Sequence, residues 1–163
     1  MATQLRDATD DFIDQWRARR PDLDTAPMAV IGRLHRLAAI LDTGVRPVFA
    51  EHGLSADDFD VLATLRRWGR PMTPSELARS VLVASGTVTK RLDRLERRGL
   101  LLRSPSPHDG RGRLVELTPD GLSLADMLAE RHWANEDRLL APLDGTERTQ
   151  LAGLLRKLLV AHE

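Results

Sequence analysis

The sequence predicts a mainly α-helical fold with one small β-hairpin. Aromatic residues make up only 4% of the 163 residues, there is no tyrosine, and leucine, alanine and arginine are abundant, which favours helix. Apolar residues recur in steps of three and four along most of the chain, and alternation with a period of two follows only after Gly99. The length suits one domain, or one domain with an appendage.

The composition also excludes several classes of protein. The chain has no cysteine, so disulfides and thiolate metal sites are excluded. Its first residues, MATQLRDATDDF, carry acids where a secretory signal needs an apolar core, and no apolar run approaches the roughly 20 residues of a membrane span. No metal-ligand spacing, triad spacing or glycine-rich phosphate loop stands out. We therefore expect a cytoplasmic protein without a membrane partner that is not an enzyme and has no catalytic residues, metal ligands or cofactor.

Two helices joined by a linker are expected first. A short helix over residues 9–19 has Thr9 as its cap, and a linker over 21–27 follows it. A long helix over 28–52 carries an apolar stripe that suits helix-on-helix packing. Pro47 removes one helical hydrogen bond, so we expect a kink near it.

The middle of the chain has clear capping signals. Ser55 caps a helix over 56–68. Thr73 and Glu76 form a capping box that opens a short helix ending by about Val81.

A helix over 85–98 then ends at Gly99 and leads into a change of pattern. A short extended segment, LLLRS, is followed by a turn-rich loop, SPHDGRG, and an alternating segment, RLVELT. Two strands around such a loop form a β-hairpin.

Two further helices complete the chain. Thr118 caps a long helix over 119–141, and Asp144 with Glu147 forms a capping pair before the last helix, which carries a leucine stripe. The apolar stripes of the terminal helices exceed what one small domain needs to cover itself, so we expect a two-fold homodimer.

The charge of the chain is zero overall but is unevenly distributed. Between Ala84 and Arg113, eight basic residues face three acidic ones, so this segment carries +5 and the rest carries −5. A basic segment in an acidic body is an electrostatic footprint for nucleic acid.

The helix over 85–98 has the composition of a DNA-reading helix. The end of such a helix that enters the major groove must offer short polar groups and long cations. We expect its DNA contacts to be Ser85, Thr87, Thr89, Lys90 and Arg94. The opposite face, with Val88, Leu92 and Leu95, is expected to pack into the core. The alternative is a helix cap followed by a solvated arginine face.

Four stretches over residues 53–121 resemble the MarR family of bacterial transcriptional regulators: GLSADDFDVLATL, TPSELA, SGTVTKRLDRLERRGLL and SPHDGRGRLVELTPDG. The resemblance implies a winged helix-turn-helix fold flanked by terminal dimerisation helices. The implied parts are an N-terminal extra helix and linker over 1–26 and a MarR-like domain over 27–163, with the winged helix over 55–118 and dimerisation helices over 27–52 and 119–162.

The hairpin loop corresponds to the wing of that family. The resemblance implies that Arg111 reaches into the minor groove and that Asp109 steadies it, and a guanidinium suits the negative potential of a narrow minor groove. The chain departs from the family at Gly110, where arginine is frequent, so one phosphate contact is expected to be missing. The alternative is a charged hairpin without a partner.

The N-terminal segment QWRARRPDLD, before PMAVIGRL, is similar to the urate-responsive subgroup of the family. That resemblance implies a ligand site built from Trp16, Asp60, Arg91 and Arg103. An aromatic face and guanidinium forks suit urate or another aromatic anion. The alternatives are that Trp16 docks its helix, that Asp60 and Arg91 form a structural ion pair, and that Arg103 touches a phosphate.

These features together predict a sequence-specific regulator of transcription. We expect a homodimer that binds a pseudo-palindromic operator in double-stranded DNA and acts as a ligand-responsive repressor. The alternative is an architectural DNA binder without a ligand, or a winged helix used only for association with other proteins.

Overall fold

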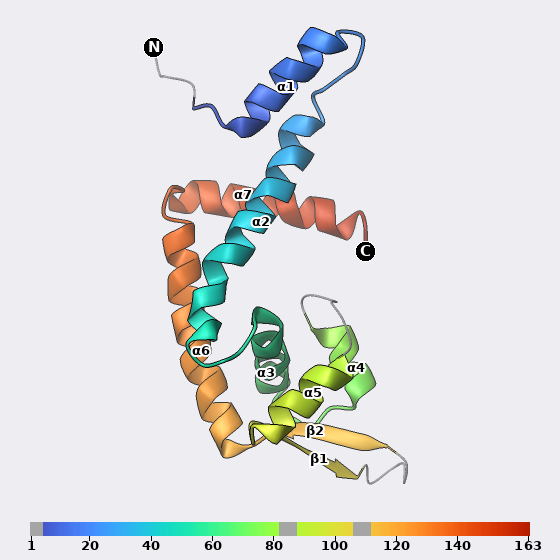
Figure 1. Cartoon of the computed structure of the whole chain (residues 1–163), viewed down its shortest axis with the longest axis vertical. Coiled ribbons are helices and arrows are strands. Elements are labelled where there is room, and N and C mark those ends of the chain that lie inside the picture. The colour runs from blue at the N-terminus through green and yellow to red at the C-terminus, as the bar shows by residue number, and fades with distance from the viewer. Residues whose placement is uncertain (1–4, 82–87, 106–111) are drawn as a thin grey trace. The chain divides into compact units, whose positions relative to one another are not determined.

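The computed structural model describes residues 5–81, 88–105 and 112–163, which are mainly helical with one antiparallel hairpin. This confirms the predicted fold class. The elements in chain order are α1 (Ala8–Arg19), α2 (Met28–Ala50), α3 (Ala56–Trp68), α4 (Pro74–Ser80), α5 (Val88–Arg97), β1 (Leu101–Pro105), β2 (Arg113–Leu117), α6 (Pro119–Leu139) and α7 (Gly145–Val160) (Figure 1). No helix in these described ranges is both long and apolar enough to cross a membrane.

The chain divides into two compact units, residues 1–44 and 45–163. The first contains α1 and most of α2. The prediction that Thr9 caps α1 is wrong, because Asp7 is the cap and accepts from the backbone N–H groups of Thr9 and Asp10. Thr9 is buried instead, and its methyl group lies close to Gly32.

Helices α1 and α2 are joined in the first unit by charged and apolar contacts. Arg33 of α2 donates to both carboxylates of the α1 capping box, on Asp7 and Asp10, at 2.7 Å. Ile13 is buried. The guanidinium of Arg36 lies 5.7 Å from the ring centre of Phe12, which is a cation–π distance.

The second unit is built around one apolar core in which α3 is central. Helix α3 packs against α4, α5, α6 and β2 (Figure 1). As predicted, Leu92 and Leu95 of α5 are fully buried, and Val88 packs against the same core. The fully buried side chains of this core also include Phe49, Val61, Leu62, Met72, Leu77, Leu101, Val115 and Leu128.

The hairpin is antiparallel and lies beside the core. Its register runs from the pair Leu101 and Leu117 to the pair Pro105 and Arg113. Met72, just before α4, exchanges backbone hydrogen bonds with Val115 of β2 at 3.0 and 2.8 Å. These two hydrogen bonds hold the start of α4 against strand β2 of the hairpin.

Local signals place most helix starts where the sequence predicts them. Ser55, Thr73 and Asp144 each form a capping box, with Asp58, Glu76 and Glu147 as the third helical residue. The hydroxyl of Thr118 accepts from the N–H of Gly121 at 3.0 Å. The described part of α5 begins at Val88, so its predicted start at residue 85 lies outside the described residues.

Helix α7 differs from the helices of the core because none of its residues is buried in the described chain. It exposes a row of apolar side chains that comprises Leu154, Leu155, Leu158, Leu159 and Val160. Part of α2 also exposes apolar side chains, namely Val30, Ile31, Leu37 and Ile40.

Candidate DNA-binding interface

Helix α5 presents two exposed polar residues in its first described turn. Thr89 and Lys90 are exposed, whereas Leu92 and Leu95 turn into the core. Lys90 forms no ion pair with the acidic side chains of the described residues. A lysine in this setting can give its three N–H donors to a phosphate or a base edge.

The arginines of α5 are already engaged within the chain. Arg91, with 14% of its side chain exposed, forms an ion pair with Asp57 of α3. Arg94 forms an ion pair with Asp58, whose side chain is only 2% exposed. Arg98, directly after α5, donates to the backbone carbonyls of His52 and Gly53 at 2.7 and 2.8 Å.

Asp58 is the most buried carboxylate of this network. Burial raises the pKa of the Asp58 carboxyl, but hydrogen bonds from Arg94 and Ser55 outweigh burial and hold the pKa below its ordinary value. Asp58 therefore stays ionised at neutral pH and anchors the arginine opposite it.

Arg103 on β1 contacts two acidic residues of α5. It forms ion pairs with Asp93 at 2.6 Å and with Glu96 at 3.4 Å. Its Nε atom is buried and has no hydrogen-bond partner among the described residues. Arg103 thus joins the first strand of the wing to α5.

The structure brings together only part of the set predicted from the sequence. Thr89, Lys90, Arg91 and Arg94 lie on α5, and Arg103 lies beside them on β1. Asp60 lies on α3 in the same unit, and Trp16, with half of its surface exposed, lies on α1 in the first unit. The predicted DNA contacts outside the described residues are Ser85, Thr87, Asp109 and Arg111.

Sequence reasoning missed the acidic partners of α5. Asp57 and Asp58 were visible as acids in the first turn of α3, where they favour helix formation. Their pairing with Arg91 and Arg94 joins residues 34 and 36 positions apart, which no local pattern encodes.

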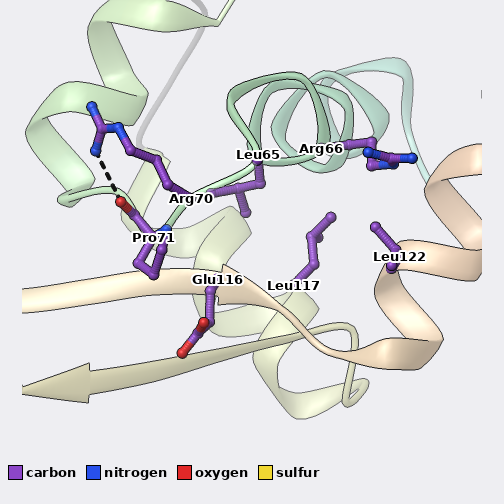
Figure 2. Close-up of a pocket in the computed structure, with 8 residues that line it drawn as sticks. Leu65, Arg66, Arg70, Pro71, Glu116, Leu117 and Leu122 are labelled. Atoms are coloured by element: carbon purple, nitrogen blue, oxygen red, sulfur yellow. Dashed lines mark hydrogen bonds between the residues drawn. The ribbon is translucent and has the colours of Figure 1, made fainter.

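A shallow hollow of about 260 Å³ lies away from α5, between the end of α3, strand β2 and the start of α6. Figure 2 shows Leu65, Leu117 and Leu122 converging on it. Both arginines that line it are engaged, Arg66 with Asp126 and Arg70 with Glu76. Arg70 also donates to the carbonyl of Pro71, next in the chain (Figure 2).

Comparison with known proteins matches residues 54–112, from the start of α3 to the wing, to the MarR family. The chain is 43% identical over 147 residues to the HTH-type transcriptional regulator PecS of Dickeya dadantii (strain 3937), and the match covers 89% of each chain.

Two solved structures extend the comparison. A mutant of MarR from Escherichia coli complexed with operator DNA is 30% identical, with a TM-score of 0.72, and the match covers 84% of this chain and 99% of that one. BpsR of Bordetella bronchiseptica, whose structure concerns regulation of DNA binding by 6-hydroxynicotinic acid, is 29% identical, with a TM-score of 0.70 and coverage of 78% and 91%. Since α4, α5 and the β1–β2 hairpin follow one another as in a winged helix-turn-helix, and since the match to PecS covers 89% of the chain, this protein belongs to the MarR family of DNA-binding transcriptional regulators.

Proposed function

We propose that the first turn of α5 reads base edges in the major groove of a pseudo-palindromic operator. The observation that carries this proposal is the exposure of Thr89 and Lys90 on a helix whose arginines are held by the protein. Ser85 and Thr87, which lie outside the described residues, are proposed as further DNA contacts by the resemblance to the family. Asp109 and Arg111, also outside the described residues, are proposed by the same resemblance, with the arginine suited to the minor groove. No catalytic step belongs to this function.

The protein acts as a homodimeric repressor in the cytoplasm. The exposed leucines of α7 in the second unit are apolar surface that a second copy can cover, and so, separately, is the exposed apolar face of α2 in the first unit. A two-fold dimer presents two copies of α5 to successive major grooves, roughly 34 Å apart along the duplex. This geometry explains why the operator is expected to be pseudo-palindromic.

Fluorescence anisotropy with an operator duplex and a scrambled duplex tests the reading function. Lys90→Ala is expected to narrow the preference for the operator by about 1–3 kcal/mol if Lys90 contacts a base. Arg19→Ala is the control for the loss of one positive charge, because Arg19 is exposed on α1, outside both α5 and α7. Equal operator preference for Lys90→Ala and wild type would show that the first turn of α5 does not read DNA.

We further propose that an aromatic anion such as urate is the effector that releases the operator. Arg91 and Arg103 are both partly buried and already hold carboxylates, so they suit a planar anion that exchanges with those acids. Trp16 supplies an aromatic face and Asp60 a further polar contact. The relative BpsR, whose DNA binding is linked to an aromatic acid, supports this class of ligand.

Titration of urate and related aromatic acids tests the effector proposal. The expected result is quenching of tryptophan fluorescence together with release of the operator, because the ligand must favour the conformer that does not bind DNA. Trp16→Phe is expected to reduce both responses while it leaves Trp68 and Trp133 in place. If none of these anions quenches fluorescence or releases DNA at millimolar concentration, the effector proposal is wrong and the DNA-reading proposal is unaffected.

A further inference from the structure

Arginines on one side of α5 reach a single short segment of the chain. Arg91, Arg94 and Arg98 are spaced by three and four residues, so they share one face of the helix. Arg91 contacts Asp57, Arg94 contacts Asp58, and Arg98 contacts the carbonyls of His52 and Gly53. These partners lie in residues 52–58, the connection before α3 and its first turn, which we call the α2–α3 junction. These ion pairs and hydrogen bonds therefore start from two turns of helix and end on one segment of seven residues.

The groups of the α2–α3 junction that accept hydrogen bonds from these arginines are held in place by the backbone. The Asp58 carboxylate accepts the N–H of Ser55 at 2.9 Å through one oxygen and Arg94 through the other. Arg98 binds two successive carbonyls just after α2, where Gly53 has a φ of +62°, the left-handed region that favours glycine. Both anchors are thus parts of the backbone or are held by it.

In the described part of α5, the buried apolar side chains lie on one side of the helix. These fully buried side chains are Leu92 and Leu95. Apolar contacts are non-directional, so they define the rotation of a helix about its axis less sharply than hydrogen bonds do. Charge-assisted hydrogen bonds from a second face add that constraint, because they are directional and short.

We propose that Arg94 and Arg98 are positioning residues that fix the rotation of α5 on the α2–α3 junction, with Asp58 as the buried anchor, and that Arg94 does not contact DNA. This proposal rests on the DNA-reading function of α5. By holding the helix, the two arginines present Thr89 and Lys90 to the groove at one angle. Specificity is affected more than general affinity, because base contacts depend on angle and phosphate contacts depend less on it.

Asp58→Asn separates a purely electrostatic role of Asp58 from a positioning role, because the two roles predict opposite changes in operator affinity. If electrostatics alone matter, removal of a negative charge near the interface strengthens DNA binding. If Asp58 holds Arg94, the variant binds the operator more weakly by about tenfold, a typical coupling between sites, while its affinity for scrambled DNA changes little. Asparagine still accepts the N–H of Ser55, so the cap of α3 is retained. Thermal unfolding verifies that the variant is folded.

Arg94→Ala and the double variant complete the experiment. Loss of a direct phosphate contact reduces the slope of log affinity against log salt by about 0.9, whereas loss of positioning leaves the slope unchanged. The double variant Asp58→Asn, Arg94→Ala is expected to be no weaker than either single variant, since both break one tie. Arg94→Lys is expected to restore part of the operator preference. Arg97→Ala is the control for charge, because Arg97 is exposed on the same helix and donates within it to the carbonyl of Asp93.

Three outcomes would overturn the proposal. The first is that Asp58→Asn binds the operator at least as tightly as wild type. The second is that Arg94→Ala reduces the slope of log affinity against log salt. In both of these cases a continued effect of Lys90→Ala shows that the reading function itself stands. If wild type shows no preference for any operator, both the reading function and the positioning proposal fail.

Discussion

Helices α3 and α7 are built by the same local rules but end in opposite environments. Each begins with an acidic capping box and carries apolar residues at helical spacing. Yet α3 buries Phe59, Val61, Leu62 and Leu65, whereas no residue of α7 is buried in the described chain. The winged helix around α3 therefore buries its core within one chain, whereas the exposed apolar face of α7 is surface that we propose a second chain covers.

The largest effect is expected when the exposed face of α7 is made polar. Leu154→Glu together with Leu158→Glu places two charges where a dimer would bury them, and burial of an unpaired carboxylate costs several kcal/mol. We expect the dimer to dissociate at micromolar concentration in sedimentation velocity, with the helix content of the core retained. Gln150→Glu, an added charge near the start of the same helix, is the control. A dimer that survives the double substitution would mean that α7 is not the dimer interface.

A buried leucine of the core provides the second comparison. Leu62→Ala removes a fully buried side chain of α3 and leaves a cavity, which lowers the free energy of unfolding by about 2–5 kcal/mol. Urea unfolding is expected to show a similar loss at low and high protein concentration, because the cavity lies within one chain. A loss that depends strongly on concentration would place Leu62 in the interface between chains instead.

Features whose partners are close in the sequence were predicted, and features whose partners are far apart were missed. The capping boxes at Ser55, Thr73 and Asp144 were predictable because the partners are three residues apart. The hairpin was predictable from its alternation and loop. Thr9 was misassigned as a cap because two suitable residues compete there, and Asp7 forms the box with Asp10.

The candidate site was less predictable than the fold. Exposure of Lys90 follows from helical periodicity, since the buried residues lie at other positions of the helix. That Arg94 meets Asp58, however, depends on how α5 crosses α3, which is decided by packing. Sequence spacing identifies the basic helix but not which of its cations the protein itself uses.

A smaller effect is expected from acid on the Asp58 anchor. Because the pKa of Asp58 is lowered in the folded chain, its stabilisation is present above the ordinary carboxyl pKa of about 3.9 and is lost as the pH falls through the folded value. Unfolding of wild type is compared with that of Asp58→Asn from pH 7 to pH 3. Wild type is expected to lose more stability over this interval, and parallel curves would show that Asp58 contributes nothing to the acid sensitivity.

The smallest effect is expected at an exposed ion pair. Arg66 and Asp126 join α3 to α6, but each side chain is half exposed, so Arg66→Ala should cost no more than about 1 kcal/mol. Urea unfolding at low and high salt should show the difference shrinking as salt screens the pair. A loss comparable to that of Leu62→Ala would indicate that Arg66 also stabilises the core through packing.

We propose, as the central claim, that two chains, joined through their terminal helices, bind one operator together. The number of chains bound to one operator duplex tests this claim most directly. Sedimentation equilibrium with one labelled operator duplex gives the number of chains bound at saturation. We expect two chains per duplex for wild type, and much weaker binding of single chains for the double variant Leu154→Glu, Leu158→Glu. One chain per duplex, bound by wild type and by this variant with equal affinity, would show that the operator does not bind a dimer paired through α7.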